Sequence, residues 1–347
     1  MILKSLRINY IEDHKGKSKT LKVENLSKEK REFLLKFFEE GIDSKPPEKR
    51  GKVQLSLKPI LTLCSQQIPS NYFFNRFPSK SSNKTFDVIC PVYYANKYFE
   101  TNVQNWFEEL PINTLYLGIN NPELKIKFND PRIEIIDQTH FKTLGACLRD
   151  LMERVKTEWF FFLHSDVELL KGSFKIMISK KGFGRGIIES NRLYLHEQTK
   201  DLNFLKYIDY NDAIRAYSGY QLIRKKAIEP ILAKIDDDYI YRNEDLIFQS
   251  ECLKNGFEYK KCWALHIHQV LDQKRTFDEY ETHVMQVKGL IKYSNPTKIN
   301  ERTLVDPLRW CKVNLKSSYN FTLNEMLRFC YQNNPNWAEI IIREWNK

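Results

Sequence analysis

Long apolar runs are missing from the sequence, and their absence excludes one class of protein. A helix that spans a bilayer needs about 18 or more consecutive apolar residues, and the 347 residues contain no such run. Residues 1–13 also lack the apolar stretch of a secretory signal peptide. We therefore expect a cytoplasmic protein that neither spans the membrane nor is secreted.

Paired cysteines are missing as well. The seven cysteines stand singly along the chain, and none belongs to the Cys-x-x-Cys pair that is typical of a structural zinc site. An odd number of scattered cysteines also argues against a disulfide framework. The cysteine pattern fits a reducing compartment.

Nucleic-acid-binding motifs are the third absence, since no helix-turn-helix, zinc finger or aromatic-and-basic RNA signature occurs. The charge distribution nevertheless favours an anionic partner. Residues 1–85 hold 18 Lys and Arg against 9 Asp and Glu, so they carry +9 of the net +11. A phospholipid surface, a pyrophosphate-linked substrate or nucleic acid would each suit this asymmetry, and so would a merely solvated basic face. Nucleic acid is the least favoured of these partners.

The composition predicts a chain with a large core. Hydrophobic residues make up 42% of the sequence, including 22 Phe and 18 Tyr, and the length lies between one and three typical domains. We expect a basic N-terminal appendage over residues 1–85, a core over residues 86–275 and a helical extension over residues 276–347. In the extension, Thr322 and Glu325 have the spacing of a capping box and predict the start of a helix.

Short apolar runs alternate with helical patterns in the first half of the core. This alternation predicts parallel βαβ units and an α/β fold, with a mixed, mostly parallel sheet flanked by helices. Ligands of such sheets bind beyond the carboxyl ends of the strands. The predicted strands are residues 87–93, 113–118, 132–136 and 159–163, and the predicted helices are residues 97–109 and 144–155.

Three groups of polar residues follow or interrupt the predicted elements. His164, Ser165 and Asp166 come directly after the fourth strand, where a carboxylate can bind a hard divalent cation or simply belong to a solvated loop. Glu244 and Asp245 open a predicted helix, where they either complement its dipole or supply a general base.

The third group is a pair of histidines in the last strand of the core. His266 and His268 lie two residues apart in the predicted strand 262–268 and therefore share one face. Such a pair forms either a hydrogen-bonded unit or part of a metal site.

The order of these segments resembles the inverting family-2 glycosyltransferases of the GT-A type, over roughly 185 residues. Residues 87–93 resemble the nucleotide-binding strand, 144–151 the Gly-x-x-x-x-Arg/Asn helix, 159–169 the strand that enters the Asp-x-Asp motif, 217–225 the acceptor-side loop and 243–246 the Glu-Asp motif.

The resemblance implies transfer of a sugar from a nucleotide-sugar donor to a hydroxyl of a glycan or lipid-linked glycan, with inversion and with Mn²⁺ or Mg²⁺ as cofactor. Asp245 would be the general base, with Glu244 beside it on the acceptor side and as the next candidate. The implied metal ligands are Asp166, His164 and either His266 or His268. The implied donor-binding residues are Pro91, Val92, Tyr93, Asn120, Gly145, Arg149, Ser165 and Asp166.

The sequence departs from the family pattern at two positions. His164 stands where the first Asp of Asp-x-Asp is usual, and a nitrogen ligand there would favour Mn²⁺ over Mg²⁺. Asn120 and Asn121 stand where an acid usually follows the second strand, which leaves the donor open. A non-catalytic glycosyltransferase-like domain is therefore one alternative, and a basic nucleic-acid-binding protein is another.

The aromatic run at residues 71–77 lies within the basic appendage. Aromatic and basic residues together suit an anionic membrane surface, so peripheral attachment is one interpretation. The other is that these rings pack the appendage onto the core.

Overall fold

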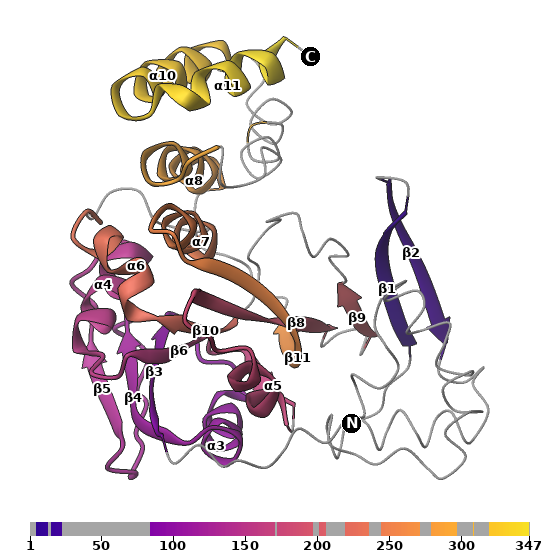
Figure 1. Ribbon diagram of the computed structural model, residues 1–347, viewed down its shortest axis with the longest axis vertical. Coiled ribbons are helices and arrows are strands. Elements are labelled where there is room, and N and C mark those ends of the chain that lie inside the picture. Colours follow the sequence, from indigo (N-terminus) through magenta and orange to yellow (C-terminus); the bar gives the residue numbers. More distant parts are fainter. Residues whose placement is uncertain are drawn as a thin grey trace.

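The computed structural model describes residues 5–12, 15–22, 84–170, 172–196, 201–205, 219–235, 244–270, 279–296, 308 and 319–346. One mixed sheet forms the centre of the protein, with helices on both of its faces (Figure 1). The aromatic run at 71–77 and the first two residues of the predicted acceptor-side loop lie outside the described residues.

The first half of the sheet consists of four parallel strands, in the order β5-β4-β3-β6. β3 and β6 are almost wholly buried, which suits strands covered on both faces, whereas β5 at the edge of the sheet combines Ile with acidic residues and is partly exposed. Helices α3 (Phe99–Glu109) and α4 (Leu144–Arg154) supply two of the crossovers. The four predicted strands are thus confirmed: they are β3 (Phe86–Val92), β4 (Ile112–Ile119), β5 (Ile133–Asp137) and β6 (Trp159–Leu163).

The second half of the sheet contains antiparallel pairs. β10 (Tyr220–Arg224) is antiparallel to both β6 and β8 (Arg185–His196), and β11 (Glu258–Val270) is parallel to β8. Of the seven strands β5, β4, β3, β6, β10, β8 and β11, all but β10 therefore point the same way. A short strand, β7 (Val167–Leu169), pairs antiparallel with β11. The predicted fold class, a mixed and mostly parallel sheet flanked by helices, is confirmed.

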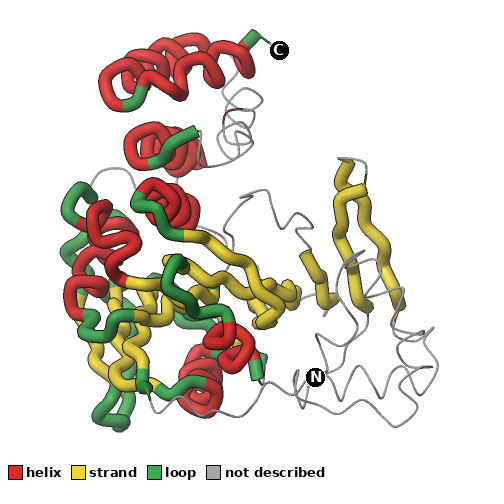
Figure 2. Tube along the Cα trace, viewed as in Figure 1, coloured by secondary structure: helices red, strands yellow, loops and turns green. Residues whose placement is uncertain are grey.

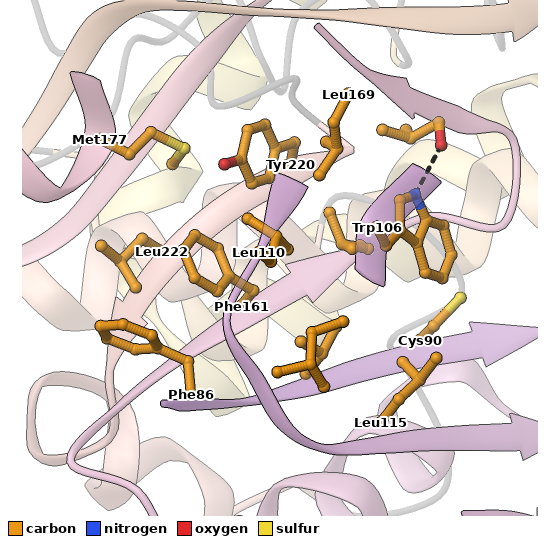
Figure 3. Close-up of a cluster of buried hydrophobic side chains, with 14 of the residues drawn as sticks. Phe86, Cys90, Trp106, Leu110, Leu115, Phe161, Leu169, Met177, Tyr220 and Leu222 are labelled. Atoms are coloured by element: carbon orange, nitrogen blue, oxygen red, sulfur yellow. Dashed lines mark hydrogen bonds between the residues drawn. The ribbon is translucent and has the colours of Figure 1, made fainter. Parts of the chain in front are cut away.

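The alternation of side chains along the strands divides the core into two layers. In β6, Phe161 packs toward α3 and α5 (Ser173–Ser179), together with Trp106 and Met177 (Figure 3). Phe160 and Phe162 pack on the opposite face, against α4, α6 (Lys225–Leu232) and α7 (Glu244–Lys254). Because β6 contributes buried rings to both layers, it lies at the centre of the core.

Helices follow the sheet in the C-terminal segment: α8 (Glu279–Tyr293), α10 (Tyr319–Asn333), a 3-10 turn at Pro335–Trp337 and α11 (Ala338–Trp345). They share a third apolar cluster with Leu246 of α7, and Trp337 is fully buried in it. The capping box predicted at Thr322 is wrong, because α10 begins at Tyr319 and Thr322 lies inside the helix. Among the described helices, none has the length and apolar character needed to cross a membrane.

The N-terminal segment contains a β-hairpin, which the sequence did not predict. β1 (Ser5–Glu12) and β2 (Lys15–Lys22) are antiparallel, and β1 also pairs in parallel with β9 (Asp201–Leu205). Since β9 pairs with β8, the hairpin extends the central sheet rather than forming a separate one (Figure 2).

Candidate metal and donor site

Three ligand-capable side chains meet at the carboxyl end of β6. His164 and Asp166 follow the strand directly, and His268 of β11 joins them because β7 pairs with β11 in a register that sets His268 opposite Val167. The ligand atoms of the three residues all lie within 4.8 Å of one another. Nε2 of His268 is 3.2 Å from Oδ2 of Asp166.

The chemistry of the three side chains fits a divalent cation. Two imidazole nitrogens and one carboxylate oxygen suit Mn²⁺ better than Mg²⁺, which prefers an all-oxygen shell. The side chains of His164 and Asp166 are 31% and 32% exposed, so a bound cation would keep open positions toward solvent.

The electrostatics of the cluster keep Asp166 ionised. Burial alone would raise the pKa of Asp166, but the charge of His268, a hydrogen bond from its ring and the charge of His164 outweigh burial and lower the pKa from 3.8 to about 2. The ionised form is thus favoured in the folded chain. Its contribution to stability is present above a pH of about 3.8 and is lost as the pH falls toward 2.

His266 lies outside this cluster, although it shares a strand with His268. Its side chain is fully buried, and Nδ1 lies 2.8 Å from Oγ of Ser190 on β8. Of the two histidines, the structure therefore brings only His268 into the three-residue cluster.

One of the two acids that open α7, Glu244, lies beside the cluster. Oε1 of Glu244 is 3.5 Å from Nε2 of His164, and both Glu244 and Asp245 are buried. Oδ1 of Asp245 accepts a hydrogen bond from the backbone N–H of Leu246 at 2.9 Å. Two motifs separated by about 80 residues of sequence thus meet at one edge of the sheet.

The segment predicted as the acceptor-side loop also reaches the cluster. The carbonyl oxygen of Gly219 accepts a hydrogen bond from the backbone N–H of His164 at 2.9 Å. A Cβ at Gly219 would lie 2.7 Å from Cγ2 of Val167 and 3.0 Å from Cγ of His164. Glycine is therefore required here by the close approach of β10 to the turn after β6.

The donor-binding residues predicted on β3 and β4 lie at the same carboxyl edge. Val92 is buried, whereas Tyr93 is 36% exposed. Ser165 donates from Oγ to the carbonyl oxygen of Tyr94 at 3.0 Å, which joins the ends of β3 and β6. Pro91 lies within β3, opposite Gly118 of β4.

Asn120 follows β4, and its Nδ2 donates to the carbonyl oxygens of Gln138 and Phe141. The side-chain N–H groups of Asn120 thus organise the loop after β5. The predicted residues of α4 are ordered by local contacts. Gly145 lies in the first turn, which Thr143 caps by accepting from the N–H of Ala146.

Arg149 donates from its guanidinium group to the carbonyl oxygen of Ile235, and so ties α4 to the segment after α6. Sequence reasoning missed Asn102 of α3 and Gln269 of β11, which lie beside the cluster. Gln269 follows His268 and could have been found by its position. Asn102 carries no such signal, because it resembles any polar residue of an amphipathic helix.

Neither a protein-family model nor a curated protein sequence matches the chain. Several solved structures are similar in part. A mannosyltransferase from Pyrobaculum calidifontis in complex with GDP-Man and Mn²⁺ has a TM-score of 0.44 and 10% identity, over 75% of this chain and 84% of that one. Such a score identifies no family.

Two further structures are more distant. A mycobacterial protein has a TM-score of 0.39 and 10% identity, over 65% of this chain and 75% of that one. HddC from Yersinia pseudotuberculosis has a TM-score of 0.36 and 12% identity, over 53% of this chain and 93% of that one.

Proposed function

We propose that the protein is a metal-dependent glycosyltransferase that transfers a sugar from a nucleotide-sugar donor to a hydroxyl of a glycan or lipid-linked glycan. One observation carries the proposal. The three-residue cluster of His164, Asp166 and His268 meets the carboxylate of Glu244 where the parallel strands end. A cation site next to an acid suits transfer from a diphosphate, because the cation can neutralise the leaving group and an acid can serve as general base.

His164, Asp166 and His268 would hold the cation, with Mn²⁺ favoured over Mg²⁺ by the two nitrogen ligands. When bound, a divalent cation neutralises the charge that develops on the departing nucleoside diphosphate. Ser165 joins the ends of β3 and β6 and so fixes the edge on which the diphosphate would lie, with the half-exposed Tyr93 beside it.

Asp245 is the proposed general base. Its carboxylate removes the proton from the acceptor hydroxyl as the hydroxyl oxygen bonds to the anomeric carbon. The bond from that carbon to the diphosphate breaks on the opposite side, so a single displacement inverts the anomeric centre. Glu244 lies beside His164, so an acceptor that contacts Glu244 would lie next to the cation site.

A panel of nucleotide sugars tests this proposal. We expect Mn²⁺-dependent release of nucleoside diphosphate from at least one donor, suppressed by excess chelator. Metal binding without turnover of any donor would instead support the non-catalytic alternative. Salt-dependent binding of oligonucleotides, in the absence of donor turnover, would favour the nucleic-acid alternative.

We also propose that an anionic membrane surface is a partner of the protein. Phe183, in the connection between α5 and β8, is 95% exposed. Its neighbour Lys181 lies over the ring of Phe86, where the basic residues 1–85 join β3. Six basic and two acidic residues surround the connection: Lys84, Lys180, Lys181, Arg185, Arg224 and Lys260, with Glu158 and Glu258.

The position of Phe183 is compatible with catalysis at the cluster. Phe86 and Trp159, over which Lys181 lies, are at the amino ends of β3 and β6, whereas the cluster is at the carboxyl end of β6. A membrane bound at Phe183 would leave the cluster open to solvent, where it could meet the glycan of an acceptor that extends away from the membrane.

Substitution of Phe183 is expected to weaken binding to anionic vesicles. Loss of one ring from the membrane interface should weaken the free energy of membrane binding by roughly 1 kcal/mol. Phe183→Ala should therefore reduce the affinity for vesicles about fivefold at low salt. Flotation with phosphatidylserine vesicles measures this. Tyr331→Ala is the matched control, since Tyr331 is 59% exposed on the distant helix α10. Equal binding by both variants, or no binding by the unaltered protein at low salt, would contradict the proposal.

A further inference from the structure

Two buried amide side chains bond to each other beside the cluster. Nδ2 of Asn102, on α3, donates to Oε1 of Gln269 at 3.0 Å, and Nε2 of Gln269 donates to Oδ1 of Asn102 at 3.2 Å. Asn102 is 1% exposed and Gln269 is 5% exposed. The two hydrogen bonds join a helix to the last strand of the sheet across 167 residues of sequence.

This amide pair is bonded to the neighbours of two of the three cluster residues. Nδ2 of Asn102 also donates to the carbonyl oxygen of Ser165 at 3.1 Å, directly before Asp166. Gln269 follows His268, and its backbone N–H donates to the carbonyl oxygen of Asp166 at 2.8 Å. The pair is therefore bonded to the backbone that carries Asp166 and His268.

Further hydrogen bonds fix the pair itself. Nδ2 of Asn96 lies 3.4 Å from Oε1 of Gln269, and Nε2 of Gln269 lies 3.5 Å from Oε2 of Glu168. Residues on α3, on the turn after β6 and on β11 thus form one polar network. Networks of this kind hold side chains in a single arrangement when their members are satisfied.

The amide pair is not needed merely to attach α3 to the sheet. Trp106 donates from Nε1 to the carbonyl oxygen of Val167 at 2.8 Å (Figure 3). Asn105 exchanges two hydrogen bonds with the backbone of Leu169, at 2.7 and 3.1 Å. These contacts already attach α3 to β7. Burial of the amides of Asn102 and Gln269 costs desolvation free energy. This cost is best explained by the residues that the two amides contact, which flank the proposed metal ligands.

We propose that Asn102 and Gln269 are positioning residues that hold Asp166 and His268 at the separation at which they bind a divalent cation. The inference rests on the proposed metal centre. Groups behind the ligands of a metal site typically change its affinity by about 10- to 100-fold when they are removed. The pair should therefore control the affinity for the metal, and it should affect turnover only because less metal is bound.

Calorimetric titration of the full chain with Mn²⁺ tests the inference. The double variant Asn102→Leu/Gln269→Met replaces both amides with apolar side chains of similar shape, so neither amide is left buried without the other. We expect it to bind Mn²⁺ about 10- to 100-fold more weakly, and to recover most of its turnover at saturating Mn²⁺. Asn105→Leu is the matched control, because it breaks two bonds between the same helix and the neighbouring strand β7. It should lower the melting temperature while leaving Mn²⁺ affinity unchanged.

Three results would separate the possibilities. Unchanged Mn²⁺ affinity in the double variant would overturn the positioning role, and so would an equal loss of affinity in Asn105→Leu. Absence of Mn²⁺ binding by the unaltered protein would instead overturn the metal centre on which the inference rests. Asn102→Ser, which adds no bulk, carries the same expectation and keeps the test decisive if the double variant is unstable.

Discussion

Asp166→Ala is expected to abolish sugar transfer while leaving the fold intact. Asp166 is the only carboxylate in the three-residue cluster of the described structure, and its depressed pKa keeps it negatively charged. Without it, two neutral imidazoles would have to hold the cation alone. Loss of the cation removes several kcal/mol of stabilisation from the departing diphosphate, so we expect a decrease in kcat of about 10³-fold or more.

The measurement combines turnover, Mn²⁺ titration and thermal melting of the same preparation. Asp130→Ala serves as the control, since Asp130 is an acid that bonds to Arg132 on an exposed loop. It should keep both activity and metal affinity. Full activity of the unaltered protein in excess chelator would refute the metal assignment.

Asp245→Asn is expected to lower the rate by about 10²-fold or more, with Mn²⁺ affinity kept. The change is nearly isosteric, but an amide cannot accept the proton of the acceptor hydroxyl. Glu244→Gln provides the comparison. Because Glu244 lies 3.5 Å from His164, its substitution should act mainly on the metal requirement and less on kcat at saturating Mn²⁺.

The comparison between these two variants decides which acid is the base. A larger loss of kcat in Glu244→Gln than in Asp245→Asn, at saturating Mn²⁺, would move the role to Glu244. The anomeric configuration of the product, read by NMR, is an independent check. Retention of configuration would contradict a single displacement by one base.

The parallel half of the sheet could be predicted from the sequence because each of its strands is rich in apolar residues and lies between polar segments. β6 is the clearest case, because its apolar run ends directly at the polar residues His164 and Asp166. β8 and β10 were not predicted. Their alternation is interrupted by buried polar residues such as Glu189 and Gln221, so no simple period marks them.

The choice between the two late histidines could not be made from sequence. A spacing of two places His266 and His268 on one face of a strand, but the register of β11 against β7 and β8 decides which of them meets Asp166. His266 instead lies against Ser190. The contact between Asn102 and Gln269 was equally inaccessible, because it depends on how α3 packs against the end of β11.

The pairing of the N-terminal hairpin with β9 has a consequence for synthesis of the chain. Ser5 of β1 is paired with Asp201, so a ribosome must add 196 more residues before this pairing can begin. At about 5–20 residues per second the delay is roughly 10–40 s. During that interval the nascent hairpin presents open hydrogen-bonding edges, which invite pairing with other chains. β2 contains four lysines in eight residues and forms the outer edge of the finished sheet. Lysine on an edge strand discourages aggregation, so part of the excess charge near the N-terminus protects the growing polypeptide.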